Sequence, residues 1–295
     1  MKFLLPTDGS SYSEAAAKFL LRLNLSAQDE IRILHVISDE PMQDQDDFYS
    51  RRIREMKQLI APSILGSTKH FLETTPAKID TSIEVGCPDS RIIEAAIQEQ
   101  ADLIVMGPKR VKGIQSHIVG SVTKSVSINS PKPILVIKPS PDEIPGKMKI
   151  LFATNGSENA RRTAEVLSSI PFHDAASITV LHVITPVFYD VPEHYVSSVN
   201  AGMKDALLSL KDREMRQADE VISQASNYLK RRFTQVDSLL REGDPTDEIL
   251  QTASELRPDI IALGSKGMGG FRGLIGSISR YILSVAECSV LIGKI

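Results

Sequence analysis

The sequence repeats itself, and this internal repeat constrains the fold more than any other feature. The same blocks recur in the same order, displaced by 147 to 157 residues. Such self-similarity indicates two copies of one folding unit, fused in tandem. The matching blocks are Leu4–Ser10 with Leu151–Ser157, Ile33–Ile37 with Val180–Ile184, Val85–Pro88 with Glu242–Pro245, Ala101–Gly107 with Pro258–Gly264, Gly120–Ser121 with Gly276–Ser277, and Ile134–Lys138 with Val290–Lys294.

The length of the chain agrees with two domains. Its 295 residues exceed the usual size of one domain, and each copy is long enough to bury its own core. Between the copies lies Pro139–Gly146, whose prolines and glycine suit a short linker. We therefore expect a first domain at residues 1–140, a linker at 141–146 and a second domain at 147–295.

Composition narrows the class of protein. A net charge of −3 with no long basic run argues against a general binder of nucleic acid or anionic membranes. The two cysteines, Cys87 and Cys288, fall at unrelated points of the copies, so neither a disulfide framework nor a thiolate metal site is indicated. No secretory signal opens the sequence, and no apolar run reaches the roughly 18 residues of a membrane span. We expect a soluble, cytoplasmic protein.

Each copy alternates strands with helices. This alternation predicts an α/β fold of two tandem, doubly wound, five-stranded, mainly parallel sheets with helices on both faces, similar to a Rossmann fold. Asp89 and Thr246 are expected to cap the helices that follow Pro88 and Pro245. Short apolar runs predict the strands at 2–6, 31–37, 79–85, 103–106 and 134–137 in copy one, and at 149–153, 177–184, 236–241, 260–263 and 290–292 in copy two.

Ligands of such folds bind beyond the carboxyl ends of the strands, which draws attention to Gly264–Ser277 in copy two. The glycines let the backbone approach a phosphate, and the loop runs into a helix whose free N–H groups favour an anion. Ser277 and Ser279 would add hydroxyl donors, and Lys266 and Arg272 would add positive charge. We expect a phosphate-bearing ligand; the alternative is a flexible glycine loop with an ordinary serine cap. The strict dinucleotide fingerprint and the Walker loop are both absent.

At these residues the chain resembles the universal stress protein family. That family carries Gly-x-x-Gly, nine residues, and then Gly-Ser or Gly-Thr as its ATP-binding signature. The resemblance covers nearly the whole chain in both copies, and it includes Pro6–Asp8, Leu34–Val36 and Pro131–Ile137. It implies that ATP or another adenine nucleotide is the cofactor. Magnesium is expected only as an escort to the phosphates, since no dedicated protein cage is visible.

Copy one departs from the signature at one glycine. The nine-residue spacing before Gly120 is intact, but Arg110 replaces the second glycine. Arg110 could grip a phosphate, or its side chain could fill the space. The positions that the resemblance implies for nucleotide contact in copy one are Pro6, Thr7, Asp8, Val36, Met106, Gly107, Arg110, Gly120, Ser121, Val122 and Thr123.

Copy two keeps the glycines and departs elsewhere. Its spacing is one residue short, and Asn155 stands where copy one has Asp8, which keeps a hydrogen-bond acceptor but loses the charge. A residue with a Cβ cannot easily take the role of a glycine. We therefore expect copy two, which keeps the glycines, to be the stronger site and copy one a weaker or lost one. The implied positions are Ala153, Thr154, Asn155, Val183, Leu263, Gly264, Lys266, Gly267, Gly276, Ser277, Ile278 and Ser279.

The predicted function is adenine-nucleotide binding by a stress-response or regulatory protein. No nucleophile elbow, His-Glu-x-x-His motif or set of paired acids indicates catalysis, so we expect at most slow ATP hydrolysis. An adenylating enzyme would need a Ser-Gly-Gly-x-Asp-Ser loop, and a receiver-like switch would need clustered acids; both patterns are missing. The remaining alternative is a scaffold that has lost the nucleotide and acts through protein contacts.

The resemblance also implies an assembly, and three other features invite interpretation. Domains of this family commonly pair through their last strands, which this chain can do internally with 134–137 against 290–292; two chains could then form a homodimer.

His35 and His182 stand in matching strands and are interpreted as packed core residues. The charged stretch 203–233 is interpreted as a solvated helix covering the sheet, with a partner surface as the alternative. Cys87 beside Pro88 is expected to be an exposed thiol, for which redox sensing is an alternative.

Overall fold

The computed structural model describes residues 1–39, 48–108, 119–138, 148–185, 201–265 and 275–294. The predicted linker and four residues of the predicted phosphate loops lie outside the described residues; these four are Arg110, Lys266, Gly267 and Arg272.

The predicted order of strands and helices is present in both copies. Every expected strand is found, with its bounds within one residue of those predicted. Copy one contains β1 (Lys2–Pro6), α1 (Ser11–Leu20), β2 (Glu30–Ser38), α2 (Phe48–Leu72), β3 (Lys78–Gly86), α3 (Pro88–Gln98), β4 (Leu103–Met106), α4 (Ser121–Asn129) and β5 (Ile134–Val136). Copy two contains β6 (Lys149–Ala153), α5 (Glu158–Ser169), β7 (Ser177–Ile184), α7 (Ala201–Leu229), β8 (Gln235–Glu242), α8 (Pro245–Leu256), β9 (Ile260–Gly264), α9 (Ser277–Val285) and β10 (Ser289–Gly293).

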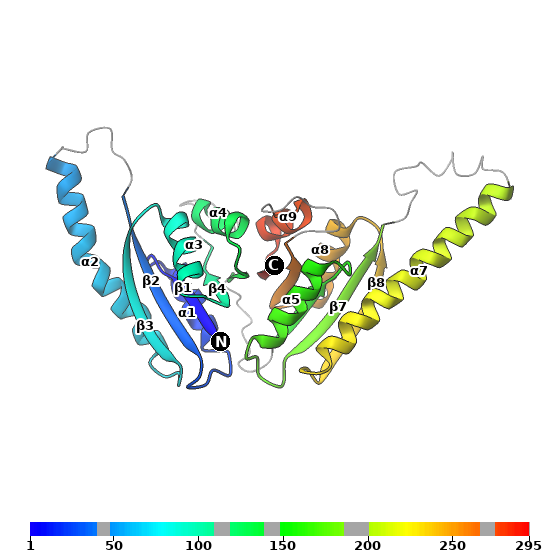
Figure 1. Ribbon diagram of the computed structural model, residues 1–295, viewed down its shortest axis with the longest axis horizontal. Coiled ribbons are helices and arrows are strands. Elements are labelled where there is room, and N and C mark those ends of the chain that lie inside the picture. The colour runs from blue at the N-terminus through cyan, green and yellow to red at the C-terminus, as the bar shows by residue number, and fades with distance from the viewer. Residues whose placement is uncertain (40–47, 109–118, 139–147, 186–200, 266–274, 295) are drawn as a thin grey trace.

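The strands form one sheet in the order β3-β2-β1-β4-β5-β10-β9-β6-β7-β8. Paired strands within each copy run parallel, whereas β5 and β10 pair antiparallel, with Leu135 opposite Leu291. Figure 1 shows the result: α4 and α9 lie near the centre, and the long helices α2 and α7 lie at the two outer sides. The predicted α/β class and the doubly wound order of each half are therefore confirmed, and the two five-stranded halves join in a single sheet.

Helices cover both faces of the sheet, as the alternation of side chains along the strands requires. Phe3 and Leu5 point into one core, and Leu4 between them points into the other. The first core lies under α1, α2, α5 and α7, and the second lies under α3, α4, α8 and α9. Each core contains residues from both copies, so the hydrophobic packing is continuous across the β5–β10 pair.

Two lysines at matching positions follow β5 and β10 and reach across to the other copy. Lys138 is only 2% exposed, and its Nζ donates to the carbonyl oxygens of Leu283 (3.1 Å) and Ala286 at the end of α9. Lys294 reciprocates by donating to Ser127 O (2.7 Å) in the last turn of α4. The last carbonyls of a helix lack intrahelical partners and attract positive charge, so each lysine caps the other copy's helix. Burial lowers the pKa of Lys138 to about 8.

The helices after β3 and β8 begin at Pro88 and Pro245, and the cap is the residue just before each proline, which corrects the predicted caps. Cys87 and Asp244 hold the cap positions, while Asp89 and Thr246 lie inside the first turn. Asp244 Oδ1 accepts hydrogen bonds from the backbone N–H groups of Thr246 (2.8 Å) and Asp247 (3.2 Å). The cause is proline, which has no N–H to lose at the first helical position and so places the cap just before itself.

Both cysteines are free thiols, Cys87 exposed and Cys288 half-buried. Cys87 Sγ donates to Asp89 Oδ1 at 2.9 Å, and this hydrogen bond raises the pKa of the Cys87 thiol. Burial raises the pKa of the Cys288 thiol to about 11. The thiolate is the reactive form, so the raised pKa of Cys87 opposes its redox-sensing interpretation.

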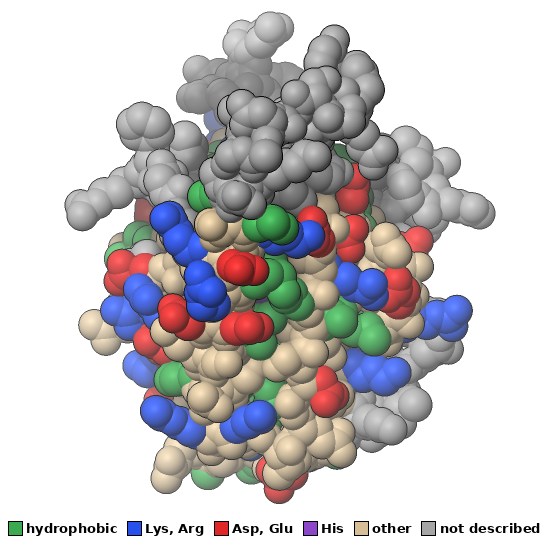
Figure 2. Space-filling view, turned by 90° about the vertical axis from the view of Figure 1, so that its right-hand side faces the viewer, with side chains coloured by type: hydrophobic (Ala, Val, Ile, Leu, Met, Phe, Trp, Pro, Cys, Tyr) green, Lys and Arg blue, Asp and Glu red, His purple; other side chains and the backbone are tan. Residues whose placement is uncertain are grey.

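The outer edge of copy two is charged. Figure 2 faces this side of the molecule and shows Lys and Arg intermixed with Asp and Glu. Near the end of β8, Glu242 pairs with Lys211 of α7 (3.8 Å) and Arg241 pairs with Glu255 of α8 (2.5 Å). Charged side chains on an edge strand discourage another strand from pairing there. Across the described residues, every helix is too short or too polar to span a membrane.

Candidate functional site

A cavity of about 530 Å³ lies beyond the carboxyl ends of β6, β7 and β9 in copy two. Its volume falls within the roughly 300–1,000 Å³ that small-molecule sites occupy. It stands where the strand order of copy two reverses, between β6 and β9, which is where ligands of doubly wound folds bind. All the predicted copy-two positions that the structure describes line it: Ala153, Thr154, Asn155, Val183, Leu263, Gly264, Gly276, Ser277, Ile278 and Ser279.

One wall of the cavity is the N-terminus of α9. Gly276 is the cap residue, with φ −65° and ψ 160°, and it makes no side-chain cap. Ser277, Ile278 and Ser279 form the first turn of α9. The backbone N–H groups of a first turn have no acceptor within the helix. The first turn carries no acidic residue, so the helix dipole there favours an anionic group.

The two serines of this turn have different roles. Ser277 is exposed at the cavity, whereas Ser279 is 4% exposed and its Oγ donates to Gly264 O at 2.6 Å. The hydroxyl hydrogen of Ser279 is therefore already used within the protein, although the residue lines the cavity. Ser279 ties α9 to the end of β9. Thr123 makes the same bond in copy one, to Gly107 O at 3.0 Å.

The first glycine of each motif is required by packing. A Cβ on Gly107 would lie 2.1 Å from the backbone oxygen of Tyr12 in α1. A Cβ on Gly264 would lie 3.0 Å from the backbone of Asn159 and Ala160 in α5. These glycines therefore let a helix approach the strand end closely, in addition to any approach by a phosphate.

The turn after β6 is held by its own side chains. Asn155 Oδ1 accepts from Ser157 N (3.1 Å), and Thr154 Oγ1 accepts from Gly156 N (3.2 Å). Gly156 has φ +73°, a left-handed conformation that glycine adopts without strain. In copy one, Asp8 Oδ1 accepts from Ser10 N at 3.0 Å in the same way. The change from aspartate to asparagine therefore keeps the turn and alters only the charge.

The sequence model of the Universal stress protein family matches residues 1–138 and again residues 147–294. The chain belongs to the universal stress protein family. Universal stress protein MJ0577 of Methanocaldococcus jannaschii is 29% identical over 152 residues, which cover 46% of this chain and 94% of that protein. Among solved structures, a universal stress protein from Archaeoglobus fulgidus matches with a TM-score of 0.66 at 22% identity and covers 99% of this chain and 98% of its own. A universal stress protein family protein from Arabidopsis thaliana with AMP bound covers 50% of this chain and 91% of its own, with 20% identity and a TM-score of 0.36.

The two strand histidines of this universal stress protein are half-buried, which corrects their interpretation as packed core residues. His182 lines the cavity, and its Nδ1 lies 2.7 Å from Thr154 O. His35 Nδ1 lies 2.8 Å from Thr7 O in the matching place. A carbonyl oxygen only accepts, so Nδ1 carries the hydrogen in both rings and each histidine ties β2 or β7 to the neighbouring strand end.

The long helix α7 contributes cavity residues that the sequence reasoning missed. Glu214, Gln217, Ala218 and Val221 all line the cavity. Their i, i+3, i+4, i+7 spacing marks one face of a helix and was legible in the sequence. The sequence could not tell that this face looks onto the strand ends. The other lining residues missed are Leu181, His182, Ile184, Thr185, Pro245 and Ile249.

In copy one, the predicted positions lie at the ends of β1, β2 and β4 and at the start of α4. Thr7 is 5% exposed, and its Oγ1 hydrogen-bonds with Ser13 Oγ (3.1 Å) and Thr68 Oγ1 of α2 (3.0 Å). These bonds join the end of β1 to both helices on that face. The repeat places Ala160 and Ala225 at the matching points of copy two, where no hydroxyl exists.

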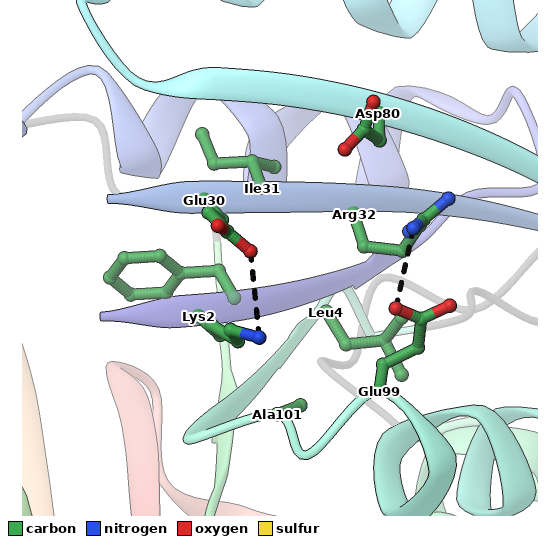
Figure 3. A pocket seen from close by; sticks show the side chains of 9 residues that line it. Lys2, Leu4, Glu30, Ile31, Arg32, Asp80, Glu99 and Ala101 are labelled. Carbon is green, nitrogen blue, oxygen red and sulfur yellow. Dashed lines mark hydrogen bonds and ion pairs between the residues drawn. The ribbon is translucent and has the colours of Figure 1, made fainter. Parts of the chain in front are cut away.

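A second hollow lies at the opposite, amino ends of β1 and β2 in copy one (Figure 3). It is bordered by the ion pairs Lys2–Glu30 (3.7 Å) and Arg32–Glu99 (3.3 Å). Its volume of about 20 Å³ holds about one water molecule. This hollow is too small for a nucleotide, and it lies away from every predicted site residue.

Proposed function

We propose that copy two binds an adenine nucleotide, with ATP as the first candidate, in the 530 Å³ cavity. The observation that carries this proposal is the convergence of ten predicted contact residues on one cavity beside the N-terminus of α9. The phosphates would lie at the first turn of α9, where backbone N–H groups and the helix dipole favour them. Magnesium would accompany the phosphates.

The nucleoside would occupy the part of the cavity nearer β6 and β7. Ala153, Val183 and Leu263 supply apolar surface there, and Thr154 and Asn155 supply polar atoms. We propose that the bound nucleotide acts as a signal in a stress response, with little or no turnover. Phosphate release at saturating ATP would test this point, and rapid turnover would contradict it.

We further propose that residues 1–140 and 147–295 act as two domains paired internally through β5 and β10. The antiparallel pairing of these strands supports this, as do the reciprocal caps made by Lys138 and Lys294. In this arrangement copy one holds the weaker nucleotide site or none. Copy one would then serve mainly as the structural partner of copy two.

Calorimetric titration with ATP and magnesium tests the proposal, with wild type compared against Ser277→Glu and Ser121→Glu. Both serines are exposed at the first position of a helix. The helix dipole stabilises an acidic side chain there, so neither substitution should destabilise the fold. In Ser277→Glu the new carboxylate competes with the phosphates, and we expect affinity to fall at least about tenfold. Ser121→Glu is the matched control in copy one and is expected to keep wild-type affinity.

Two results would overturn the proposal. Folded wild-type protein that binds no adenine nucleotide would remove the nucleotide function and favour the scaffold. Loss of binding in Ser121→Glu, with binding retained in Ser277→Glu, would move the site to copy one. Circular dichroism of both variants establishes that they are folded.

A further inference from the structure

The inner face of α7 forms the wall of the cavity that lies across the sheet from α9. Val221 lies against the turn after β6, because a Cβ on Gly156 would come within 2.7 Å of it. Glu214 is seven residues earlier, which places it about 10 Å further along the helix axis. The helix α7 packs on the first core and α9 on the second, so the cavity bridges the two layers.

Glu214 has acceptor atoms and, among the residues that the structure describes, no partner of its own. It is half-buried and lines the cavity together with Gln217. Within the described part of the chain, neither side chain makes a hydrogen bond or ion pair, and the nearby Lys211 pairs with Glu242 instead. A partly desolvated carboxylate gains most from a donor that a ligand brings, because charge-assisted hydrogen bonds are the strong ones.

The matching face of copy one has the opposite chemistry. The repeat aligns Glu214 with Lys57 and Gln217 with Ile60, and it keeps a buried alanine, Ala218 or Ala61, on the next turn. Lys57 Nζ donates to Ser38 O, at the end of β2, at 3.1 Å. The face therefore changes from a cation and an apolar side chain in copy one to a carboxylate and an amide in copy two.

We propose that Glu214, assisted by Gln217, is the specificity-determining residue for the nucleoside end of the ligand in copy two. Its carboxylate accepts a hydrogen bond from a ribose hydroxyl or from the amino group of the base. It thereby supplies a carboxylate in the copy where Asn155 stands at the position that Asp8 holds in copy one. The inference rests on the proposed function of this cavity.

The first experiment measures ATP affinity by calorimetry for wild type, Glu214→Gln and the control Glu220→Gln. Glu220 is exposed on the same helix and does not line the cavity, so its substitution makes the same change of charge elsewhere. We expect Glu214→Gln to weaken binding about tenfold and Glu220→Gln to leave it within about twofold. Glu214→Lys, which installs the copy-one residue type, is expected to weaken binding further.

The second experiment identifies the donor with three analogues: 2′-deoxy-ATP, 3′-deoxy-ATP, and purine riboside triphosphate, which lacks the amino group. The analogue that lacks the contacted donor is expected to bind wild type and Glu214→Gln equally. Equal weakening of ATP and all three analogues by Glu214→Gln would show a general field effect and overturn the hydrogen bond.

The two proposals fail in different ways. If wild type binds ATP and Glu214→Gln binds it equally well, Glu214 has no role in specificity and the nucleotide function stands. If folded wild type binds neither ATP nor any analogue, the proposed function itself has failed. Thermal unfolding of each variant distinguishes lost binding from lost folding.

Discussion

The two copies agree where backbone packing sets the requirement and differ where side chains face open space. In both, a glycine caps the last helix, and a hydroxyl from Thr123 or Ser279 ties that helix to the preceding strand end. On the long helix, however, Lys57 of copy one is replaced by Glu214 of copy two. The shared residues make the same structural contacts in both copies, whereas Lys57 and Glu214 differ in charge at matching positions.

A second difference lies beneath the turn after the first strand of each copy. In copy one, Thr7 is bonded to Ser13 and Thr68, which binds α2 to the strand end. In copy two, alanines at both matching places leave Thr154 without these partners, and the space nearby is part of the cavity. Copy one thus uses Thr7 to hold the helix, whereas Thr154 of copy two, also buried, lines the cavity.

The largest effect on stability is expected at Gly107 and Gly264, matching glycines that leave different amounts of space for a Cβ. Gly107→Ala would place a Cβ 2.1 Å from the backbone oxygen of Tyr12, whereas Gly264→Ala meets its nearest atoms at 3.0 Å. Both contacts are with backbone, but the first is far closer, so we expect Gly107→Ala to lower the free energy of unfolding by about 3 kcal/mol or more, and Gly264→Ala by about 1 kcal/mol. Urea unfolding followed by circular dichroism measures both.

The control for these substitutions is Gly66→Ala in α2. A Cβ there meets nothing within 4 Å, so the better helix propensity of alanine should stabilise the protein by up to about 1 kcal/mol. Equal effects at Gly107 and Gly264 would mean that the two helix–strand contacts relax alike. The packing contrast between the copies would then be wrong.

The next effect concerns the reciprocal lysines, which are buried to different extents. Lys138→Met removes the donor from Leu283 O and Ala286 O, and we expect a loss of about 2 kcal/mol from these buried carbonyls. Lys294 is half-buried, so water can replace its ammonium, and Lys294→Met should cost about 1 kcal/mol. Urea unfolding at pH 7 compares the two variants.

The contribution of Lys138 to stability should depend on pH. The pKa of Lys138 falls from 10.5 to about 8 in the folded chain. Between these values the native state releases a proton that the unfolded state keeps, so stability from this group rises with pH in that window. The pKa of Cys288, raised to about 11, acts in the opposite direction above pH 9, but the cysteine is present in both proteins. The stability gap between wild type and Lys138→Met should therefore widen from pH 8 to 10.5, and parallel pH curves would contradict this.

Much of the fold could be predicted because its signals are local or repeated. Apolar runs gave the strands to within one residue, and the alternation of elements gave the parallel order of each half. The region of the candidate site could be predicted because the carboxyl ends of adjacent parallel strands meet, and the resemblance to the family supplied the individual positions. This is why residues as distant as Thr154 and Ser277 were assigned to one site and do border one cavity.

The remainder depends on contacts between distant side chains, which no local pattern encodes. Nothing in the sequence around Ser279 indicates whether its hydroxyl is free. Only the structure shows that its Oγ donates to Gly264 O. The spacing of Glu214, Gln217, Ala218 and Val221 indicates one face of a helix. Which part of the molecule that face meets depends on how α7 packs on β7. Lys138 follows an ordinary strand, and its acceptors lie more than a hundred residues away.

The smallest effect compares the caps of α3 and α8. Asp244 caps α8 through two backbone N–H groups, whereas Cys87 makes no side-chain cap on α3. The backbone of Cys87 (φ −72°, ψ 119°) nearly matches that of Asp244 (φ −72°, ψ 126°), so a capping side chain would fit there. We expect Cys87→Asn to stabilise the protein by about 0.5 kcal/mol, and Asp244→Ala to destabilise it by about 1 kcal/mol, in urea unfolding.

Asparagine suits this test because it caps without placing a second negative charge beside Asp89. Cys87→Ala is the control and should change stability little, since the thiol caps nothing. Asp89 Oδ1 already accepts from Ser90 N at 2.9 Å. If Cys87→Asn gives no gain, that carboxylate already satisfies the first turn of α3. The two copies would then cap equally well by different side chains, and the apparent difference between their helices would disappear.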